Sequence, residues 1–189
     1  MIAGSGRQRR RTVPPPLSLL AAWAVFAALF PHSLAAQQDE RSVRAAFVYN
    51  LTKYVIWPAP AHELNICVFG GGATGPALKQ VVEGKLSDGR PIHIRLEPSD
   101  AQLSHCDVVY WSDTATSRVR SVLDKTRGTA ILTVGEDERF VREGGMIGFV
   151  RAGDSIQIEV NLDSVKAGGL KISSRLLDLA LIVHTQRRG

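Results

Sequence analysis

The chain has 189 residues, of which 44% are hydrophobic and 22% are charged, an ordinary composition for one globular domain. The formal net charge is +5, but four of the 23 basic residues are arginines at positions 7, 9, 10 and 11, in a segment that we expect to be removed. The remaining 19 basic and 18 acidic residues leave a charge of about +1, which gives no electrostatic reason to bind nucleic acid or anionic lipid.

Residues 1–36 have the parts of a secretory signal peptide. A basic start is followed by an apolar run over residues 17–30, which is short for a membrane span. Pro31 and small residues come next, and we expect cleavage near Ala35 or Ala36. A retained membrane anchor is the alternative interpretation. Because no later stretch is long and apolar enough to span a bilayer, we expect residues 37–189 to be exported as one α/β domain.

The exported part alternates between helical and extended patterns. Residues 37–40 are predicted to be a loose tail, and residues 42–54 have apolar side chains at helical spacing until the Trp57-Pro58 corner, where proline ends the helix. Further along, short apolar runs predict strands, and apolar residues three and four apart predict helices. The expected strands are residues 64–69, 91–96, 107–111 and 129–134, and the expected helices are residues 77–82, 114–123 and a short one around Phe140.

The last quarter of the chain carries the clearest patterns. Residues 146–150 and 155–160 are predicted strands, and the composition between them predicts a hairpin turn. A short helical turn follows. Ser173-Ser174 then predicts the start of a long helix that runs to Val183 and is apolar nearly all round. Such a helix is buried on several sides, either in the core of its own fold or against another chain.

Strands that alternate with helices predict a Rossmann-like three-layer α/β sandwich. We expect a mostly parallel sheet of about six strands, ending in an antiparallel hairpin and the long C-terminal helix.

The two cysteines, Cys67 and Cys106, both lie in the exported part. In an oxidising compartment an even pair is most simply one disulfide, which would close a loop of about 40 residues and stabilise the fold by about 4 kcal/mol. Two buried free thiols are the alternative. A Cys106–His105 nucleophile is a weaker interpretation, because adjacent residues on a strand point to opposite faces.

A glycine-rich loop, Gly70-x-Gly72-x-x-Gly75, lies between a predicted strand and a predicted helix. This spacing occurs where backbone amides cradle a phosphate, and Glu97 ends the next predicted strand, where a ribose-binding acid would lie. We favour a plain turn, because Pro76 removes an amide at the helix start. A nucleotide-like ligand is the alternative.

Other chemical signals are weak. The four histidines of the exported part do not form a metal-binding pattern, so we expect no metal and no cofactor. Glu136, Asp137 and Glu138 are interpreted as solvated acids or helix N-terminal charge. Ser112-Asp113 follows a predicted strand at the end where open sheets bind ligands, or caps the next helix. Because no catalytic set and no Gly-x-Ser-x-Gly motif is present, we predict that the protein is not an enzyme.

Two separated segments resemble the YfiR family of exported bacterial proteins. Residues 44–58 read RAAFVYNLTKYVIWP, and residues 144–180 carry GGMIGF, the Asn161-Leu162 pair, GGLKISS and the Leu176-Leu177 pair. The resemblance covers essentially the whole exported chain. It implies a Rossmann-like α/β domain that forms a homodimer, with a disulfide at the positions of Cys67 and Cys106. A second cysteine pair known in some members is absent here.

The resemblance also implies a function in biofilm control. Such a protein is a periplasmic repressor that binds the periplasmic portion of an inner-membrane diguanylate cyclase and keeps cyclic di-GMP low. An OmpA-like outer-membrane lipoprotein sequesters the repressor and releases the cyclase. The candidate partner or dimer contacts are Trp57, Leu176, Leu179 and Ile182. Two alternatives are a small-molecule-binding sensor module that acts with a sensor kinase, and an exported enzyme.

Overall fold

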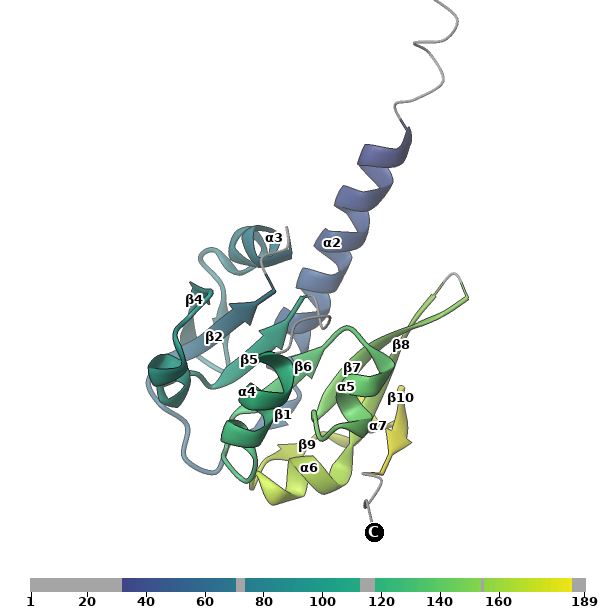
Figure 1. Ribbon diagram of the computed structural model, residues 1–189. Coiled ribbons are helices and arrows are strands. Elements are labelled where there is room, and N and C mark those ends of the chain that lie inside the picture. Colours follow the sequence, from purple (N-terminus) through teal and green to yellow (C-terminus); the bar gives the residue numbers. More distant parts are fainter. Residues whose placement is uncertain (1–31, 71–73, 113–117, 154, 185–189) are drawn as a thin grey trace, which may run out of the picture. The chain divides into compact units, whose positions relative to one another are not determined.

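A sheet of eight strands lies at the centre of the fold, in the order β10-β8-β7-β6-β5-β2-β4-β3 (Figure 1). The computed structural model describes residues 32–70, 74–112, 118–153 and 155–184. Neighbouring strands are parallel except in the β7–β8 and β3–β4 pairs. The strands are β2 (Leu64–Phe69), β3 (Leu86–Ser87), β4 (Arg90–Leu96), β5 (Val108–Trp111), β6 (Leu132–Gly135), β7 (Ile147–Ala152), β8 (Ser155–Asn161) and β10 (Ala180–Val183).

The mostly parallel sheet and its antiparallel C-terminal hairpin, β7–β8, are therefore confirmed. The expected number of strands was too low, because β3 and β10 at the two edges were not predicted. β3 has only two residues, which is too short for a recognisable alternation of polar and apolar side chains.

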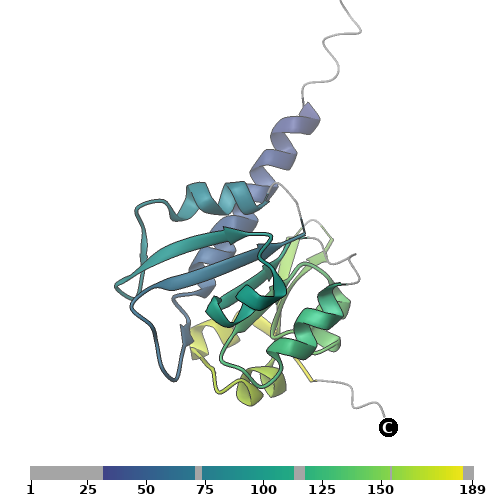
Figure 2. The same ribbon diagram turned by 60° about the vertical axis from the view of Figure 1, so that its left-hand side comes forward.

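Helices cover both faces of the sheet (Figures 1 and 2). Side chains of β2 and β5 alternate between two cores: Ile66 and Val108 pack in the core that holds residues of α2 and α3, whereas Phe69 and Val109 pack in the core that holds residues of α4 and α5. The predicted three-layer arrangement follows from this alternation. The helices are α2 (His32–Leu51), α3 (Thr74–Val82), η2 (Asp100–His105), α4 (Arg118–Thr126), α5 (Glu138–Arg142), α6 (Leu162–Ala167) and α7 (Ser174–Leu177).

The N-terminal helix begins earlier than its apolar pattern indicated. Residues 37–40, expected to be a loose tail, belong to α2, which ends at Leu51. The chain then forms β1 (Val55–Ile56), which pairs with β9 (Lys171–Ile172) in a separate two-stranded sheet. Residues Asp39–Gly189 form one compact unit and Met1–Gln38 another. Among the described residues, each helix is too short or too polar to cross a bilayer.

The predicted long C-terminal helix is wrong. Ser173 does cap a helix, since its side chain accepts a hydrogen bond from the backbone N–H of Arg175, but that helix, α7, ends at Leu177. Ala180–Val183 instead forms β10, parallel to β8. By periodicity alone, this run of apolar residues fits a helix or a strand equally well. The β-branched residues Ile182 and Val183 favour a strand, and this strand pairs with the edge of β8 that β7 does not occupy.

Candidate functional site

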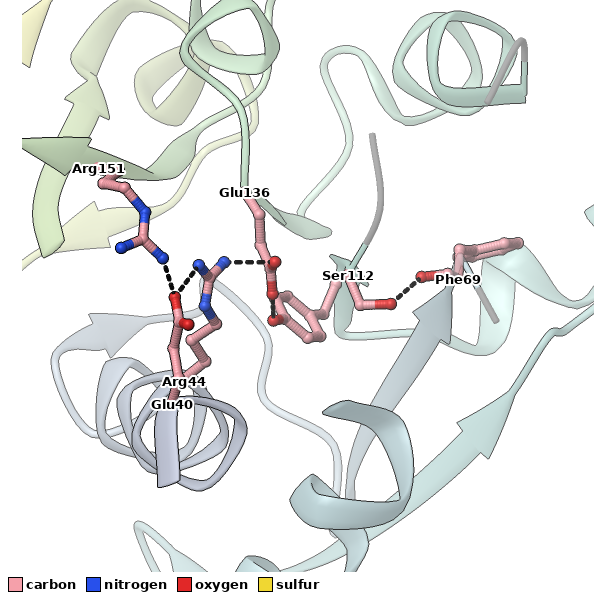
Figure 3. A network of polar contacts seen from close by, with 7 residues as sticks. Glu40, Arg44, Phe69, Ser112, Glu136 and Arg151 are labelled. Atoms are coloured by element: carbon pink, nitrogen blue, oxygen red, sulfur yellow. Dashed lines mark hydrogen bonds and ion pairs between the residues drawn. The ribbon is translucent and has the colours of Figure 1, made fainter. Parts of the chain in front are cut away.

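The order of the strands creates a switch point between β2 and β5. The chain leaves β2 through α3 to reach β4 on one side, and then returns through η2 to β5 on the other side. In open α/β sheets, ligands bind in the crevice outside the carboxyl ends of the strands at such a point. Figures 1 and 3 show this edge, where β2 and β5 both end.

The two strand ends at the switch point are joined directly. The backbone N–H and the Oγ–H of Ser112 both donate to the carbonyl oxygen of Phe69, at 3.0 and 3.1 Å. The rings of Phe69 and Trp111 stack in parallel, with their centroids 4.7 Å apart. Ser112 thus lies at the predicted end of the sheet, whereas Asp113 falls outside the described residues.

The glycine-rich loop starts at this same edge. Gly70 follows β2 with a positive φ of 103°, and Gly75 lies in the first turn of α3. A Cβ on Gly75 would approach Leu96 Cδ2 to 2.9 Å, so this glycine allows α3 to pack closely on the sheet. Gly72 lies outside the described residues. Close helix packing is thus a sufficient reason for Gly75, and no observation here requires a phosphate.

Beside the switch point, a network of charged side chains connects α2 with β5, β6 and β7 (Figure 3). Glu136 follows β6 and accepts hydrogen bonds from the phenol of Tyr110 and the guanidinium of Arg44. Arg44 also donates to Glu40 at 2.7 Å, and Arg151 of β7 pairs with the same Glu40 carboxylate. Two arginines and two glutamates balance one another, so the network carries no net charge.

Burial controls the proton affinities in this network. It raises the pKa of Glu136 and outweighs the opposing effects of Tyr110 and Arg44. Burial, followed by the charge of Glu136, also raises the pKa of Tyr110, which therefore stays a protonated donor. The hydrogen bond from Arg44 lowers the pKa of Glu40. Burial disfavours the charged form of Arg44, yet the two carboxylates leave its pKa raised. The network thus holds α2 against the sheet, with every charge paired.

Sequence reasoning did not find this network. Glu136 was interpreted as a solvated acid, but only 13% of its side chain is exposed, so that prediction is wrong for Glu136. Asp137 matches the helix N-terminal interpretation, because its side chain accepts from the backbone N–H of Arg139 at the start of α5. The i,i+4 spacing of Glu40 and Arg44 was the only local signal of the network.

The predicted disulfide is present. Cys67 of β2 and Cys106, directly after η2, are bonded, with their Cα atoms 5.8 Å apart. Both residues are buried in the core between the sheet and the helices α4 and α5. The bond connects β2 to the segment that enters β5, and so fixes both strands of the switch point. A Cys106–His105 nucleophile is excluded, because the sulfur of Cys106 is bonded to Cys67.

The four candidate contact residues divide into two groups. Trp57 and Leu176 are buried in the core of the single chain. Leu179 and Ile182 are exposed, by 77% and 36%, and Leu181 between them is 48% exposed. All three exposed residues lie on or beside β10, an edge strand whose outer side pairs with no other strand of the described residues.

The described residues contain no group of three or more histidine, cysteine or acidic side chains that would hold a metal ion. His93 and His184 each lie near one exposed carboxylate, Glu63 at 3.6 Å and Asp163 at 3.2 Å. Such isolated pairs are surface contacts rather than ligand sets.

The comparison with known families shows to which family this chain belongs. The sequence profile of the YfiR/HmsC-like family matches residues 41–181, a range that runs from the second half of α2 through the disulfide to the start of β10. The chain belongs to the YfiR/HmsC-like family. The family is periplasmic and regulatory, it suggests a regulator of diguanylate cyclase signalling, and it is not itself a family of enzymes. A search of curated proteins gives no match.

Two solved structures align with this YfiR/HmsC-like chain at low sequence identity, and the first of them shows a similar fold. A Streptococcus pneumonia protein described as an ABC domain in complex with L-Trp aligns with a TM-score of 0.50 and 12% identity, over 64% of this chain and 55% of its own. A conserved domain protein from Vibrio cholerae aligns with a TM-score of 0.49 and 12% identity, over 77% and 60%. The chain thus spans a little over half the length of each of these structures.

Proposed function

We propose that this protein is an exported periplasmic repressor that binds the periplasmic portion of an inner-membrane diguanylate cyclase and lowers cyclic di-GMP and biofilm formation. Membership of the YfiR/HmsC-like family is the observation that carries the proposal. In this scheme residues 1–36 are the signal peptide, cleaved near Ala35 or Ala36. An OmpA-like outer-membrane lipoprotein sequesters the repressor and so restores cyclase activity.

The repressor acts by differential binding. A protein that contacts a membrane receptor can shift the receptor between two conformations only to the extent that it binds one of them more tightly. Each tenfold difference in affinity for the two receptor states corresponds to about 1.4 kcal/mol. Repression of this kind needs no chemical reaction by the protein. The ion pairs of the charge network and the buried disulfide then have a structural role, because they hold the fold that presents the binding surface.

The contact surface for the receptor, or for a second copy in a homodimer, is the β10 edge. Three exposed apolar side chains, Leu179, Leu181 and Ile182, lie on or beside this strand, whose outer side has no partner strand in the described part of the chain. Of the two buried candidates, Leu176 of α7 directly precedes this edge in the chain. Trp57 instead lies against Arg90 of β4, so it is not part of this surface.

Deletion and complementation test both the function and the surface. A strain with an intact cyclase and a deleted gene should contain more cyclic di-GMP, and the wild-type protein should restore the low level. Leu181→Glu should fail to restore it, because a charge on β10 opposes apolar contact. Leu86→Glu is the matched control, since Leu86 is 54% exposed on β3 at the opposite edge. Unchanged cyclic di-GMP in the deletion strain would exclude repression.

The switch point favours one second candidate, a small-molecule-binding sensor module that acts with a sensor kinase. The ends of β2 and β5, joined through Ser112 and Phe69, lie where such folds bind ligands. Thermal unfolding in the presence of nucleotides and small metabolites separates the two functions. A ligand that stabilises the wild type at micromolar concentration but does not stabilise Ser112→Ala supports a sensor at this edge, whereas a repressor without a site there shows no such difference between the two proteins.

A further inference from the structure

Three neighbouring residues at the β3 edge of the sheet bury polar groups without a partner. Among the described residues, Nε and Nη1 of Arg90, Oγ of Ser87 and Nε1 of Trp57 are inaccessible to solvent and form no hydrogen bond. Arg90 is only 8% exposed, and Ser87 is completely buried. Buried polar groups are almost always hydrogen-bonded, and buried charges are almost always paired, so this cluster requires a reason.

The fold brings these three side chains together. Ser87 of β3 is the direct partner of Arg90 of β4 in the antiparallel register, which places both side chains on the same face of the strand pair. The guanidinium carbon of Arg90 lies 5.0 Å from the centre of the Trp57 ring. The turn between β3 and β4 contains Asp88 and Gly89 in left-handed conformations, which close the hairpin tightly enough to set this register.

The cluster is complementary to a negatively charged acceptor. Arg and Trp side chains only donate hydrogen bonds, and a serine hydroxyl donates readily, so the unpaired groups share one chemical character. The cation also lacks a counter-ion, because no carboxylate of the described residues forms an ion pair with Arg90. Arg44 makes the contrast clear, since this other largely buried arginine pairs with two carboxylates, Glu40 and Glu136.

Two lysines lie near Leu86, the residue before Ser87. The phenol of Tyr49 on α2 donates to the carbonyl of Leu86, the residue next to Ser87, at 3.2 Å. The ammonium groups of Lys53 and Lys85 lie over the Tyr49 ring, 4.1 and 5.0 Å from its centre. Two ammonium groups therefore lie near the chain segment that carries Ser87.

We propose that Arg90, Ser87 and Trp57 form a binding site for one oxyanion group, a carboxylate or a phosphate. The guanidinium supplies the counter-charge and hydrogen bonds in a planar fork, and the serine hydroxyl and the indole N–H complete the coordination of the oxygens. Lys53 and Lys85 attract the anion without entering the site. This site is separate from the β10 edge and from the switch point.

Thermal unfolding with defined anions tests the site. The protein is refolded from urea into Tris chloride, so that no anion from the cell remains, and is then titrated with inorganic phosphate or succinate against sodium chloride at equal ionic strength. At about 100 times Kd, the specific anion should raise Tm by about 5 °C or more above the chloride control. A response to phosphate alone or to succinate alone identifies the source of the oxyanion.

Variants and a spectroscopic readout locate the effect. Arg90→Met should abolish the specific rise in Tm, whereas Arg95→Met, on the same strand with an exposed side chain, should retain it. In ¹⁵N spectra the indole Nε1–H signal of Trp57 should shift on titration, and that of Trp111 should not. A wild-type protein that responds no more to phosphate and succinate than to chloride would refute the site. An equal rise in the Arg90→Met variant would refute it too.

Discussion

Reduction of the Cys67–Cys106 disulfide should destabilise the protein by an amount that follows from the length of the closed loop. The two cysteines are 39 positions apart, and a loop of this length costs the unfolded chain about 4 kcal/mol of conformational freedom at 25 °C in the chain-entropy model. For a domain of this size, that difference corresponds to a fall in Tm of about 8–16 °C.

The structure determines how the bond must be reduced. Cys67 and Cys106 are 0% and 4% exposed in the core against α4 and α5, so a reductant reaches the sulfurs only when the fold opens. The protein should therefore be reduced in urea and refolded under reducing conditions. Reduction keeps both sulfur atoms in the core, whereas replacing both cysteines by alanine also removes packing and should lower the free energy of unfolding further.

Urea unfolding, followed by tryptophan fluorescence and by far-UV circular dichroism, measures the difference between the oxidised and reduced forms. The Cys67→Ala/Cys106→Ala double variant is the control, since its unfolding should not respond to reductant. If the fully reduced protein, verified by thiol titration, unfolds at the same urea concentration as the oxidised protein, the bond does not stabilise the fold through the unfolded chain.

Three other predictions concern side chains whose burial the structure defines. Arg44→Met leaves the largely buried carboxylate of Glu136 without its cation, and should lower the free energy of unfolding in urea by about 2 kcal/mol. Arg127→Met removes one partner of an exposed ion pair and should lower it by less than about 0.5 kcal/mol. Burial raises the pKa of Glu136, so its contribution to stability is complete below its ordinary value of 4.5 and is lost as pH rises through the folded-state pKa. The stability of the wild type relative to Glu136→Gln should therefore decrease from pH 4 to pH 7, and the opposite trend would contradict the role of burial. Leu176→Ala should lower the free energy of unfolding, measured by calorimetry, by about 2–5 kcal/mol. Leu179→Ala should lower it by less than about 0.5 kcal/mol, because of these two residues only Leu176 is buried.

The interior of the sheet was predictable because its strands are buried on both faces. The predicted strands 64–69 and 107–111 contain the continuous apolar runs 66–69 and 108–111, which is the pattern of a central parallel strand. Their bounds agree with β2 and β5 to within one residue. The edges were less predictable. β10 has only four residues, and its neighbouring side chains Leu181 and Ile182, which point to opposite faces, are both exposed. The apolar composition of the segment alone therefore suggested a buried helix.

The polar features were predictable only where they are local. Asp137 and Ser173 cap helices through their neighbours in sequence, and both roles were anticipated. Glu136, in contrast, contacts Arg44, 92 positions away, and the guanidinium of Arg90 in β4 lies over the ring of Trp57, which follows β1. Such pairings depend on the order of the strands, which a single sequence does not specify.

The two proposed surfaces can be separated because they lie at opposite edges of the sheet. Six strands stand between β10 and β3, which corresponds to about 30 Å at the usual spacing of neighbouring strands. Leu181→Glu should therefore abolish repression or dimerisation but leave the anion-dependent rise in Tm unchanged, and Arg90→Met should do the reverse. If phosphate or succinate instead alters dimerisation in the wild type but not in Arg90→Met, the oxyanion site is coupled to the β10 edge. The anion would then be a signal that regulates the repressor, because an effect at one site on affinity at the other is reciprocal.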